Sequence, residues 1–377
     1  MKLHVLFLLT CLGTPTLAQP KFESQVIDDN VEIGYGLAIG DVDGDGKDDI
    51  LLADKKQFVW YRNGDWKRFV MVDNLTAADN VCIAARDINN DGKVEVAVGA
   101  QWNPGETSDT AKSGSVHYLI RPSDPTQAWT PVKLYHEATI HRMRWAKASE
   151  NNFDLIVVPL HGKGNKNGEG TPVNILAYDV PKDPRTTWQH TVIDNSMHLT
   201  HNLDIVANGK GESIYIGGKE GIQVLEFQNG KWSVVPNAAS FAKGDPFGEI
   251  RVTKSKSIAG IQPMHGNQLV VYPSGGSSSR NVLATDLNQG HALAYDQFVP
   301  SGEQIIVGWR EPNSEKKTGI KIFVFQPEKK QWQDYWIDDG GIACEDLQSA
   351  DLDGDGKKDI IAAGRSSHNL KIYWNRN

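Results

Sequence analysis

A nine-residue acidic motif occurs three times in this sequence, each time between two short apolar runs. The copies cover residues 41–49 (DVDGDGKDD), 87–95 (DINNDGKVE) and 351–359 (DLDGDGKKD). The first copy follows the run 36–40 and precedes the run 50–53. Short apolar runs bounded by Gly and Asp are typical of buried β-strands. The motif therefore predicts a strand–loop–strand unit.

This unit is the first half of a longer repeat of four strands. In the first copy, a third run ends in aromatic residues at 58–61 and a fourth run covers 66–72. Related units begin near residues 36, 82, 141, 201, 248, 291 and 346. Four short strands in every 40 or 50 residues, roughly, is the pattern of a β-propeller. We therefore expect an all-β fold, a single seven-bladed β-propeller with four antiparallel strands in each blade.

The two ends of the sequence predict how the ring closes. The last unit stops after its third strand, at residues 370–374, whereas residues 22–28 form a strand-like run with no unit of their own. Pairing of residues 21–29 with residues 369–375 completes the seventh blade. It also removes an open sheet edge.

Residues 1–18 have the features of an export signal: Lys2, the apolar run 3–12 and a small-residue cleavage site at 16–18. We therefore expect an exported protein, periplasmic or secreted, in which residues 19–377 form the propeller. A lipid-modified form at Cys11 is the alternative. Two cysteines remain, Cys82 and Cys344, too few for a disulfide framework.

The formal charge of −8 argues against a nucleic-acid partner, because binding of phosphates needs a basic face. No later run approaches the length of a membrane span, so we expect no transmembrane segment. We expect a monomer.

The acidic motifs are candidate calcium sites. Alternate carboxylates place oxygen atoms along a tight turn, whose Gly residues allow the left-handed backbone that folds them inward. The candidate ligands are Asp41, Asp43, Asp45 and Asp49, with the Lys47 carbonyl; Asp351, Asp353, Asp355 and Asp359; and Asp87, Asn89, Asp91 and Glu95. The last set carries less charge and should bind more weakly. An Asp-rich and Gly-rich turn without an ion is the alternative. Calcium here is expected to be structural, on one face of the disc.

Histidines gather on the opposite face when the units are aligned. Gly36, His141, His291 and Asp346 fall at one position at the start of the innermost strand, His201 and Glu249 reach it with a one-residue gap, and Cys82 occupies it in the second unit. Residues that follow the second strands face the same opening: Lys55, Gln101, Trp102, His161, Lys219, His265, Arg310 and Arg365. We therefore predict a funnel at the centre of this face, the default ligand site.

Two kinds of chemistry suit such a funnel. One is a divalent metal site, with zinc, manganese or magnesium held by His141, His201, Glu249, His291 and Asp346. The other is general acid–base catalysis, with His141, His161, His201, His265, Arg310 and Arg365 as candidate catalytic residues. Lys55, Gln101, Trp102 and Lys219 are candidates for substrate binding. A single histidine in a strand is more often a core residue, so the repeated position is what favours a site.

The acidic repeats resemble FG-GAP/VCBS propeller repeats. The last unit, with CEDLQSAD at 344–351, AGR at 363–365 and NLKIYWN at 369–375, resembles the propeller domain of aldos-2-ulose dehydratase/isomerase proteins. This resemblance implies elimination chemistry on an oxidised sugar, with metal ions and histidines at the propeller site. Fungal members of that family carry cupin domains after the propeller. The sequence ends at residue 377, so an isomerisation that needs those domains is not expected.

Three functions are therefore open at this point. The first is a carbon–oxygen lyase that acts on a keto sugar or 3-keto glycoside by β-elimination or dehydration. The second is a lyase that cleaves uronate polysaccharides, in which a carboxylate replaces the ketone as electron sink. The third is a non-catalytic, calcium-dependent propeller that binds carbohydrate or protein. Fold similarity alone does not choose among them.

Overall fold

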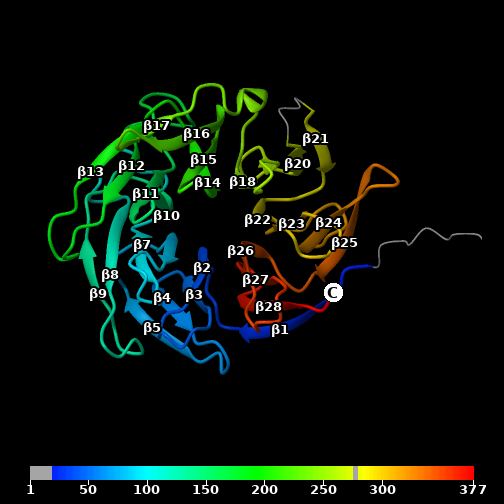
Figure 1. Cartoon of the computed structure of the whole chain (residues 1–377), viewed down its shortest axis with the longest axis horizontal. Coiled ribbons are helices and arrows are strands. Elements are labelled where there is room, and N and C mark those ends of the chain that lie inside the picture. The colour runs from blue at the N-terminus through cyan, green and yellow to red at the C-terminus, as the bar shows by residue number, and fades with distance from the viewer. Residues whose placement is uncertain (1–18, 275–278) are drawn as a thin grey trace, which may run out of the picture.

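The computed structural model describes residues 19–274 and 279–377. Within these ranges the strands form seven antiparallel four-stranded sheets arranged as a ring, which confirms the predicted seven-bladed propeller (Figure 1). The predicted export signal, residues 1–18, lies outside the described residues. Among the described residues, no helix has the length and apolar character that a membrane crossing requires.

Each blade runs from an inner strand at the centre to an outer strand at the rim. The first three blades are β2 (Gly36–Gly40), β3 (Asp49–Ala53), β4 (Gln57–Tyr61), β5 (Arg68–Asp73); β6 (Cys82–Arg86), β7 (Glu95–Ala100), β8 (Ser115–Ile120), β9 (Thr130–Lys133); and β10 (Ile140–Ser149), β11 (Asn152–Pro159), β12 (Ile175–Asp179), β13 (His190–Asp194). The fourth and fifth are β14 (Thr200–Asn208), β15 (Gly211–Gly218), β16 (Gly221–Gln228), β17 (Lys231–Val234); and β18 (Glu249–Val252), β19 (Ile258–Gln262), β20 (Gln268–Tyr272), β21 (Asn281–Ala284).

The sixth blade is β22 (Gly290–Asp296), β23 (Gln304–Trp309), β24 (Gly319–Gln326), β25 (Gln331–Asp339), and the seventh is β26 (Cys344–Ala350), β27 (Asp359–Gly364), β28 (Asn369–Asn375) and β1 (Phe22–Asp28). A short 3-10 helix, η1 (Ser240–Ala242), lies between the fourth and fifth blades. The observed inner strands begin within two residues of the predicted unit starts.

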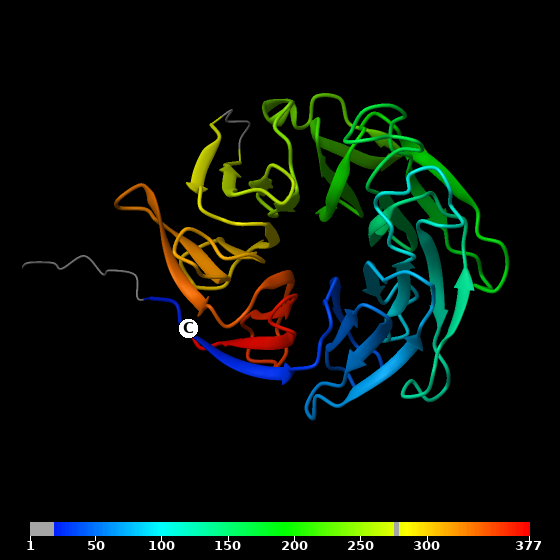
Figure 2. The ribbon, with the colours of Figure 1, turned by 180° about the vertical axis from the view of Figure 1, so that it is seen from behind.

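The chain closes the ring as predicted. Strand β1 pairs antiparallel with β28, from Phe22 opposite Asn375 to Asp28 opposite Leu370. Figure 2 shows the blue strand β1 along the red strand β28, with the C-terminus beside the start of β1. The N-terminal strand therefore covers the edge that β28 would otherwise expose.

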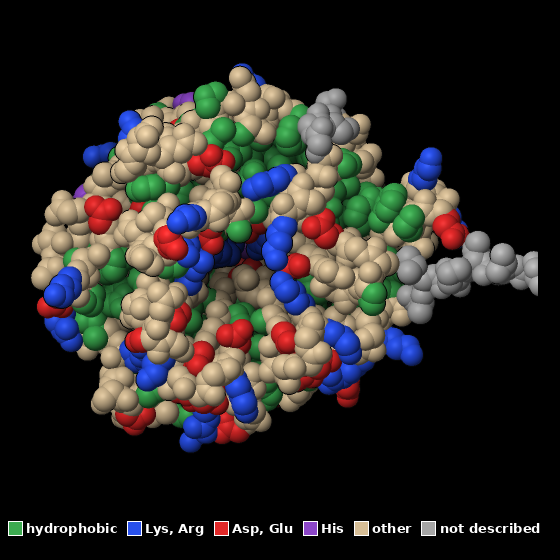
Figure 3. Space-filling model, in the orientation of Figure 1, with side chains coloured by type: hydrophobic (Ala, Val, Ile, Leu, Met, Phe, Trp, Pro, Cys, Tyr) green, Lys and Arg blue, Asp and Glu red, His purple; other side chains and the backbone are tan. Residues whose placement is uncertain are grey.

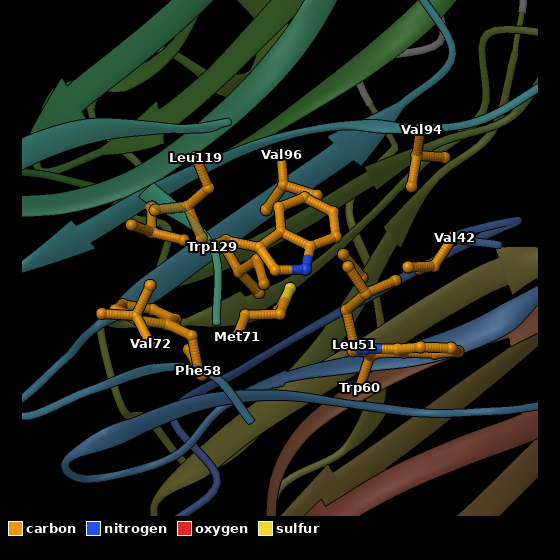
Figure 4. Close-up of a cluster of buried hydrophobic side chains, with 14 of the residues drawn as sticks. Val42, Leu51, Phe58, Trp60, Met71, Val72, Val94, Val96, Leu119 and Trp129 are labelled. Carbon is orange, nitrogen blue, oxygen red and sulfur yellow. The ribbon is translucent and has the colours of Figure 1, made fainter. Parts of the chain in front are cut away.

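The core lies between the blades rather than within them. Side chains alternate along a strand, so a blade with two apolar faces needs a neighbour on each side. In β3, Leu51 packs toward the second blade whereas Ile50 and Leu52 pack toward the seventh. Figure 4 shows the cluster between the first two blades, in which Trp60 and Trp129 are almost fully buried. Each pair of adjacent blades shares such a cluster of described residues.

The closure generates a first prediction. Deletion of residues 19–30 removes β1 and leaves β28 as an unpaired edge, so the variant should melt several degrees lower and aggregate. Thermal unfolding and light scattering measure both effects. A chain that lacks only residues 1–18 is the matched control, and an unchanged melting temperature in the longer deletion would contradict the role given to β1.

Candidate active site

Four inner strands contain a β-bulge at the same place. In β10 the register passes from Ile140–Pro159 to Arg142–Val158, so His141 has no partner in the ladder. The equivalent unpaired residues are His201 in β14, His291 in β22 and Glu345 in β26. A bulge re-aims the side chain that it carries. Three imidazoles and one carboxylate therefore occupy one position around the centre of the ring.

This register corrects the sequence alignment at two points. The seventh blade contributes Glu345 rather than Asp346, and His201 lies in line with the other histidines without a gap. Asp346 pairs with Ala363, and its carboxylate accepts the backbone N–H groups of Leu37 (2.7 Å) and Leu347 (2.9 Å). The bulge adds to β26 one residue that has no partner in β27, and alignment of the units by their second strands did not allow for it.

Each bulged histidine bonds to the backbone of the next blade. Nδ1 lies 2.8 Å from the His201 carbonyl oxygen in His141, 2.9 Å from that of Gly248 in His201, and 2.6 Å from that of Glu345 in His291. Because a carbonyl oxygen only accepts, Nδ1 carries the hydrogen in all three rings. In a neutral ring, Nε2 then presents a lone pair.

Burial keeps these rings neutral. Burial lowers the pKa of His141, His201 and His291, and the neighbouring charged groups Arg142 and Arg310 lower the pKa of His141 and His291 further. A fourth imidazole, His265 in the turn after β19, has a pKa lowered by burial and by His201 to about 2. Four neutral imidazoles are suited to metal binding or to accepting a proton.

Three of the four could hold one metal ion. One ring nitrogen from each of His201, His265 and His291 lies within 4.8 Å of the others. Nε2 of His201 lies 2.9 Å from Nε2 of His265, so these two nitrogens either share a hydrogen or face one cation. The backbone carbonyl on Nδ1 is the outer partner that orients metal-binding histidines.

Three of the predicted channel ligands are not in this group. Nε2 of His141 faces the Arg142 guanidinium at 3.3 Å. Glu249 lies 3.3 Å from Nδ1 of His201, on the side of the ring away from the metal-facing nitrogen. Asp346 is held by backbone N–H groups, as described above. The structure groups His265 with His201 and His291 instead.

Three of the four rings, those of His141, His265 and His291, line a cavity of about 380 Å³, which we call the histidine pocket. Its lining includes Tyr35, Val81, Trp102, Pro104, His141, Arg142, His265, Gln289, His291, Arg310, Glu311, Glu345 and Arg365. The Trp102 ring lies 5.1 Å from that of His141. Figure 3 shows one face of the disc, where Lys and Arg side chains surround a central hollow in which no histidine is visible.

Glu345 fixes two of the pocket arginines. Arg310 donates to both of its carboxylate oxygens at 3.2 and 3.1 Å, and Arg365 donates to one of them at 3.2 Å. Arg310 also donates to Gln289 at 2.6 Å. The two guanidinium groups are therefore held in place before any ligand binds.

Four predicted residues do not line the pocket. Lys55 pairs with Glu32 at the surface, Gln101 accepts the Ala78 N–H, and Lys219 donates to the Gly168 carbonyl. The backbone N–H of His161 donates to the Thr139 hydroxyl. All four follow second strands as expected, but the turns that carry them direct their side chains elsewhere.

Sequence reasoning missed Tyr35, Arg142, Gln289 and Glu345. Glu345 adjoins the predicted Asp346, so an alignment that allowed for a one-residue bulge would have identified it. Arg142 follows the predicted His141 but is paired with Val158 in the ladder. Tyr35 immediately precedes the first inner strand and is buried. No sequence signal sets it apart from the other tyrosines.

The acidic loops have the predicted place between inner and second strands. One carboxylate oxygen from each of Asp41, Asp43 and Asp45 lies within 4.8 Å of the others, and Asp351, Asp353 and Asp355 repeat the arrangement. The ninth-position acids are tied to backbone. Asp49 accepts from Val42 and Asn63, and burial raises its pKa to about 7; Asp359 accepts from Leu352 and Asn375, and burial raises its pKa to about 6.

The loop at 87–95 differs from these two. Asn89 replaces a carboxylate, and its amide donates to Glu95 at 2.8 Å. Asp87 accepts the N–H groups of Asn90 and Gly92. The loop keeps the turn geometry with fewer charged oxygens, as expected for weaker cation binding.

Comparisons with known proteins agree with the resemblance seen in the sequence. Residues 113–274 match the family described as "Aldos-2-ulose dehydratase, beta-propeller domain", and residues 41–98 match "FG-GAP-like repeat". The aldos-2-ulose dehydratase of Phanerodontia chrysosporium is 23% identical over 287 residues, which cover 71% of this chain and 31% of that protein. The chain resembles the propeller domain of aldos-2-ulose dehydratase. The family match at 113–274 includes His141, His201 and His265. The chain spans about a third of the length of the curated relative that it matches.

Solved structures support the fold alone. A chain of the mitotic checkpoint complex aligns with a TM-score of 0.57 at 12% identity and covers 100% of both chains. BBS1N, in its complex with ARL6DN, aligns with a TM-score of 0.58 at 12% identity and covers 96% of this chain and 98% of that one.

We propose that the loops at 41–49 and 351–359 bind calcium. A ligand that binds only the folded state at a hundred times its dissociation constant stabilises it by about 2.7 kcal/mol. A chelator should therefore lower the melting temperature. Asp43→Asn and Asp353→Asn should each reduce that chelator effect, and Asp91→Asn should change it less. If the melting curve is the same with and without chelator, the proposal is wrong.

Proposed function

We propose that this chain is a carbon–oxygen lyase that removes water or an alcohol from a keto sugar or a 3-keto glycoside. The observation that carries the proposal is the histidine pocket, where neutral imidazoles face guanidinium groups in one cavity. The similarity to a protein named aldos-2-ulose dehydratase supports it. Export to the periplasm or medium is part of the proposal.

The reaction requires two proton transfers and one carbon–oxygen cleavage. A ketone acidifies the C–H bond on the adjacent carbon, and removal of that proton gives an enolate. The enolate electrons then form a carbon–carbon double bond as the C–O bond at the next carbon breaks. The leaving oxygen takes a proton and departs as water or an alcohol, and the sugar becomes an enone.

The donor set of the pocket fits a metal ion. His201, His265 and His291 would hold it, because their nitrogens converge and carbonyl oxygens fix Nδ1–H in His201 and His291. Imidazole nitrogens suit zinc better than manganese or magnesium, which prefer oxygen ligands. When bound, such a metal supplies a Lewis acid that polarises the ketone oxygen.

The remaining groups have separate tasks. Nε2 of His141, which is outside the group of three, accepts the proton from the carbon adjacent to the ketone. Arg142 and Arg365 stabilise the enolate oxygen with charged N–H donors. The Trp102 ring, beside His141, packs against a face of the sugar. Glu345 acts through the two arginines that it holds.

Loss of an imidazole should abolish turnover. His141→Ala, which removes the proposed base, should lower kcat/KM by at least about a hundredfold, the low end for a general acid–base group. His201→Ala, which removes a proposed metal ligand, should lower kcat/KM to a similar extent. Ultraviolet absorbance of the enone, with 3-keto glycosides and keto sugars as substrates, measures the rate. His190→Ala, on the outer strand β13, is the matched control and should keep full activity. Unchanged turnover in both pocket variants would contradict the proposal.

A parallel assay with uronate polymers distinguishes the chemistry. Unsaturated uronate from those polymers, with no enone from keto sugars, would replace the proposed substrate by a uronate. Binding of carbohydrate without turnover of either class would replace the enzyme by a binding propeller.

The grouping of the histidines can be tested by metal analysis. His265→Ala should weaken zinc binding at least about tenfold, since even an outer-shell change typically costs that much. His141→Ala should retain zinc, because its nitrogen is outside the group. Calorimetric titration with zinc measures both affinities. Equal loss in both variants would contradict the assignment of the three ligands.

A further inference from the structure

Elimination also needs a group that gives a proton to the leaving oxygen, and most pocket residues cannot supply it. His141 is the proposed base, and His201, His265 and His291 are the proposed metal ligands, so each imidazole already has a task. Arginine side chains stay charged. Both oxygens of Glu345 accept hydrogen bonds from arginine. Among the described residues that line the pocket, Tyr35 carries the one hydroxyl group.

Tyr35 is held in a fixed position in the pocket wall. Its side chain is 8% exposed, and its hydroxyl donates to Oδ2 of Asp79 at 3.1 Å. Burial and the Asp79 carboxylate raise the pKa of Tyr35, so the phenol keeps its proton at neutral pH. The Arg365 guanidinium lies 5.5 Å from the ring centre, where its positive charge favours the phenolate that forms after proton transfer.

Asp79 connects this hydroxyl with solvent. Its side chain is 24% exposed and lies 3.6 Å from the Lys56 ammonium group. Its backbone carbonyl accepts the N–H of Trp102 at 2.9 Å. The segment that carries Asp79 is therefore fixed beside the pocket wall, and the carboxylate lies between a buried phenol and water.

We infer that Tyr35 is a catalytic residue, the general acid that protonates the leaving oxygen, and that Asp79 returns a proton to it from solvent. The inference rests on the proposed function and adds a group to it. In each cycle the base takes the proton adjacent to the ketone, and the Tyr35 O–H bond breaks as the leaving oxygen gains its hydrogen. The base then releases its proton to water while the phenolate regains one through Asp79. No proton is gained or lost overall.

Leaving groups of different basicity test this role. Loss of a simple alkoxide needs an acid, whereas 4-nitrophenolate leaves readily without one. Tyr35→Phe should therefore lower kcat by at least about a hundredfold on a methyl 3-keto glucoside. On the 4-nitrophenyl 3-keto glucoside it should lose less than about tenfold, because no protonation step remains to be catalysed. Asp79→Asn should show the same pattern with a smaller loss.

Controls separate catalysis from structure. Tyr135→Phe, whose hydroxyl contacts Glu137 outside the pocket, should match the wild type on both substrates. The melting temperature of Tyr35→Phe should stay close to the wild-type value, since the ring is retained. Equal losses on the two glucosides, or no loss on either, would overturn the general-acid role while leaving the proposed function intact. Absence of wild-type turnover on both glucosides and on the keto sugars would overturn the proposed function and this inference together.

Discussion

The structure depends on the packing of each blade between two others. Strands such as β3 are apolar on both faces, so a single blade would expose one of them to water. Burial of both faces needs a neighbour on each side, and a ring satisfies that need for every blade at once. The closed ring and its central channel both follow from this constraint. The site depends on it too, because the ring brings inner strands from distant parts of the chain to one centre.

The inner strands are the edges of their sheets, so some of their backbone groups have no partner within the blade. The pocket is built on such groups. A bulge residue has no ladder partner, so its carbonyl oxygen can accept from a neighbouring blade while its side chain turns to the channel. His141 and His291 each bond to the carbonyl oxygen of the bulged residue in the next blade, His201 and Glu345. One local irregularity therefore orients the imidazole and links adjacent blades. Glu345 also has two roles: its carboxylate binds two arginines, and its backbone carbonyl oxygen binds one histidine.

Most of the fold and part of the candidate site could be predicted from the sequence. The residues that could not be predicted were missed for a physical reason. Repeated motifs and alternating apolar residues predicted seven blades, the closing strand and the histidine face, because those features have fixed periods. The exact ring of side chains was harder, because a bulge shifts register by one residue without any compositional mark. Asp346 was therefore chosen where Glu345 lies. Turn geometry also decided which of the predicted rim residues face inward: His265 does, whereas His161 and Lys219 do not. Tyr35 depends on a contact with Asp79 across blades, which no local pattern encodes.

Closure by β1 has a consequence for the time course of folding. The side chains of Gln25 and Trp374 meet in the seventh blade although 349 residues separate them. At a synthesis rate of about 5–20 residues per second, the first strand waits roughly 17–70 s for its partner. During that interval the emerging chain is an arc whose two flanks are open to chaperones and to other nascent copies. Strand β1 is synthesised first but pairs last, because its partner β28 is synthesised last. The open edges of the arc can therefore pair with other chains until β28 emerges.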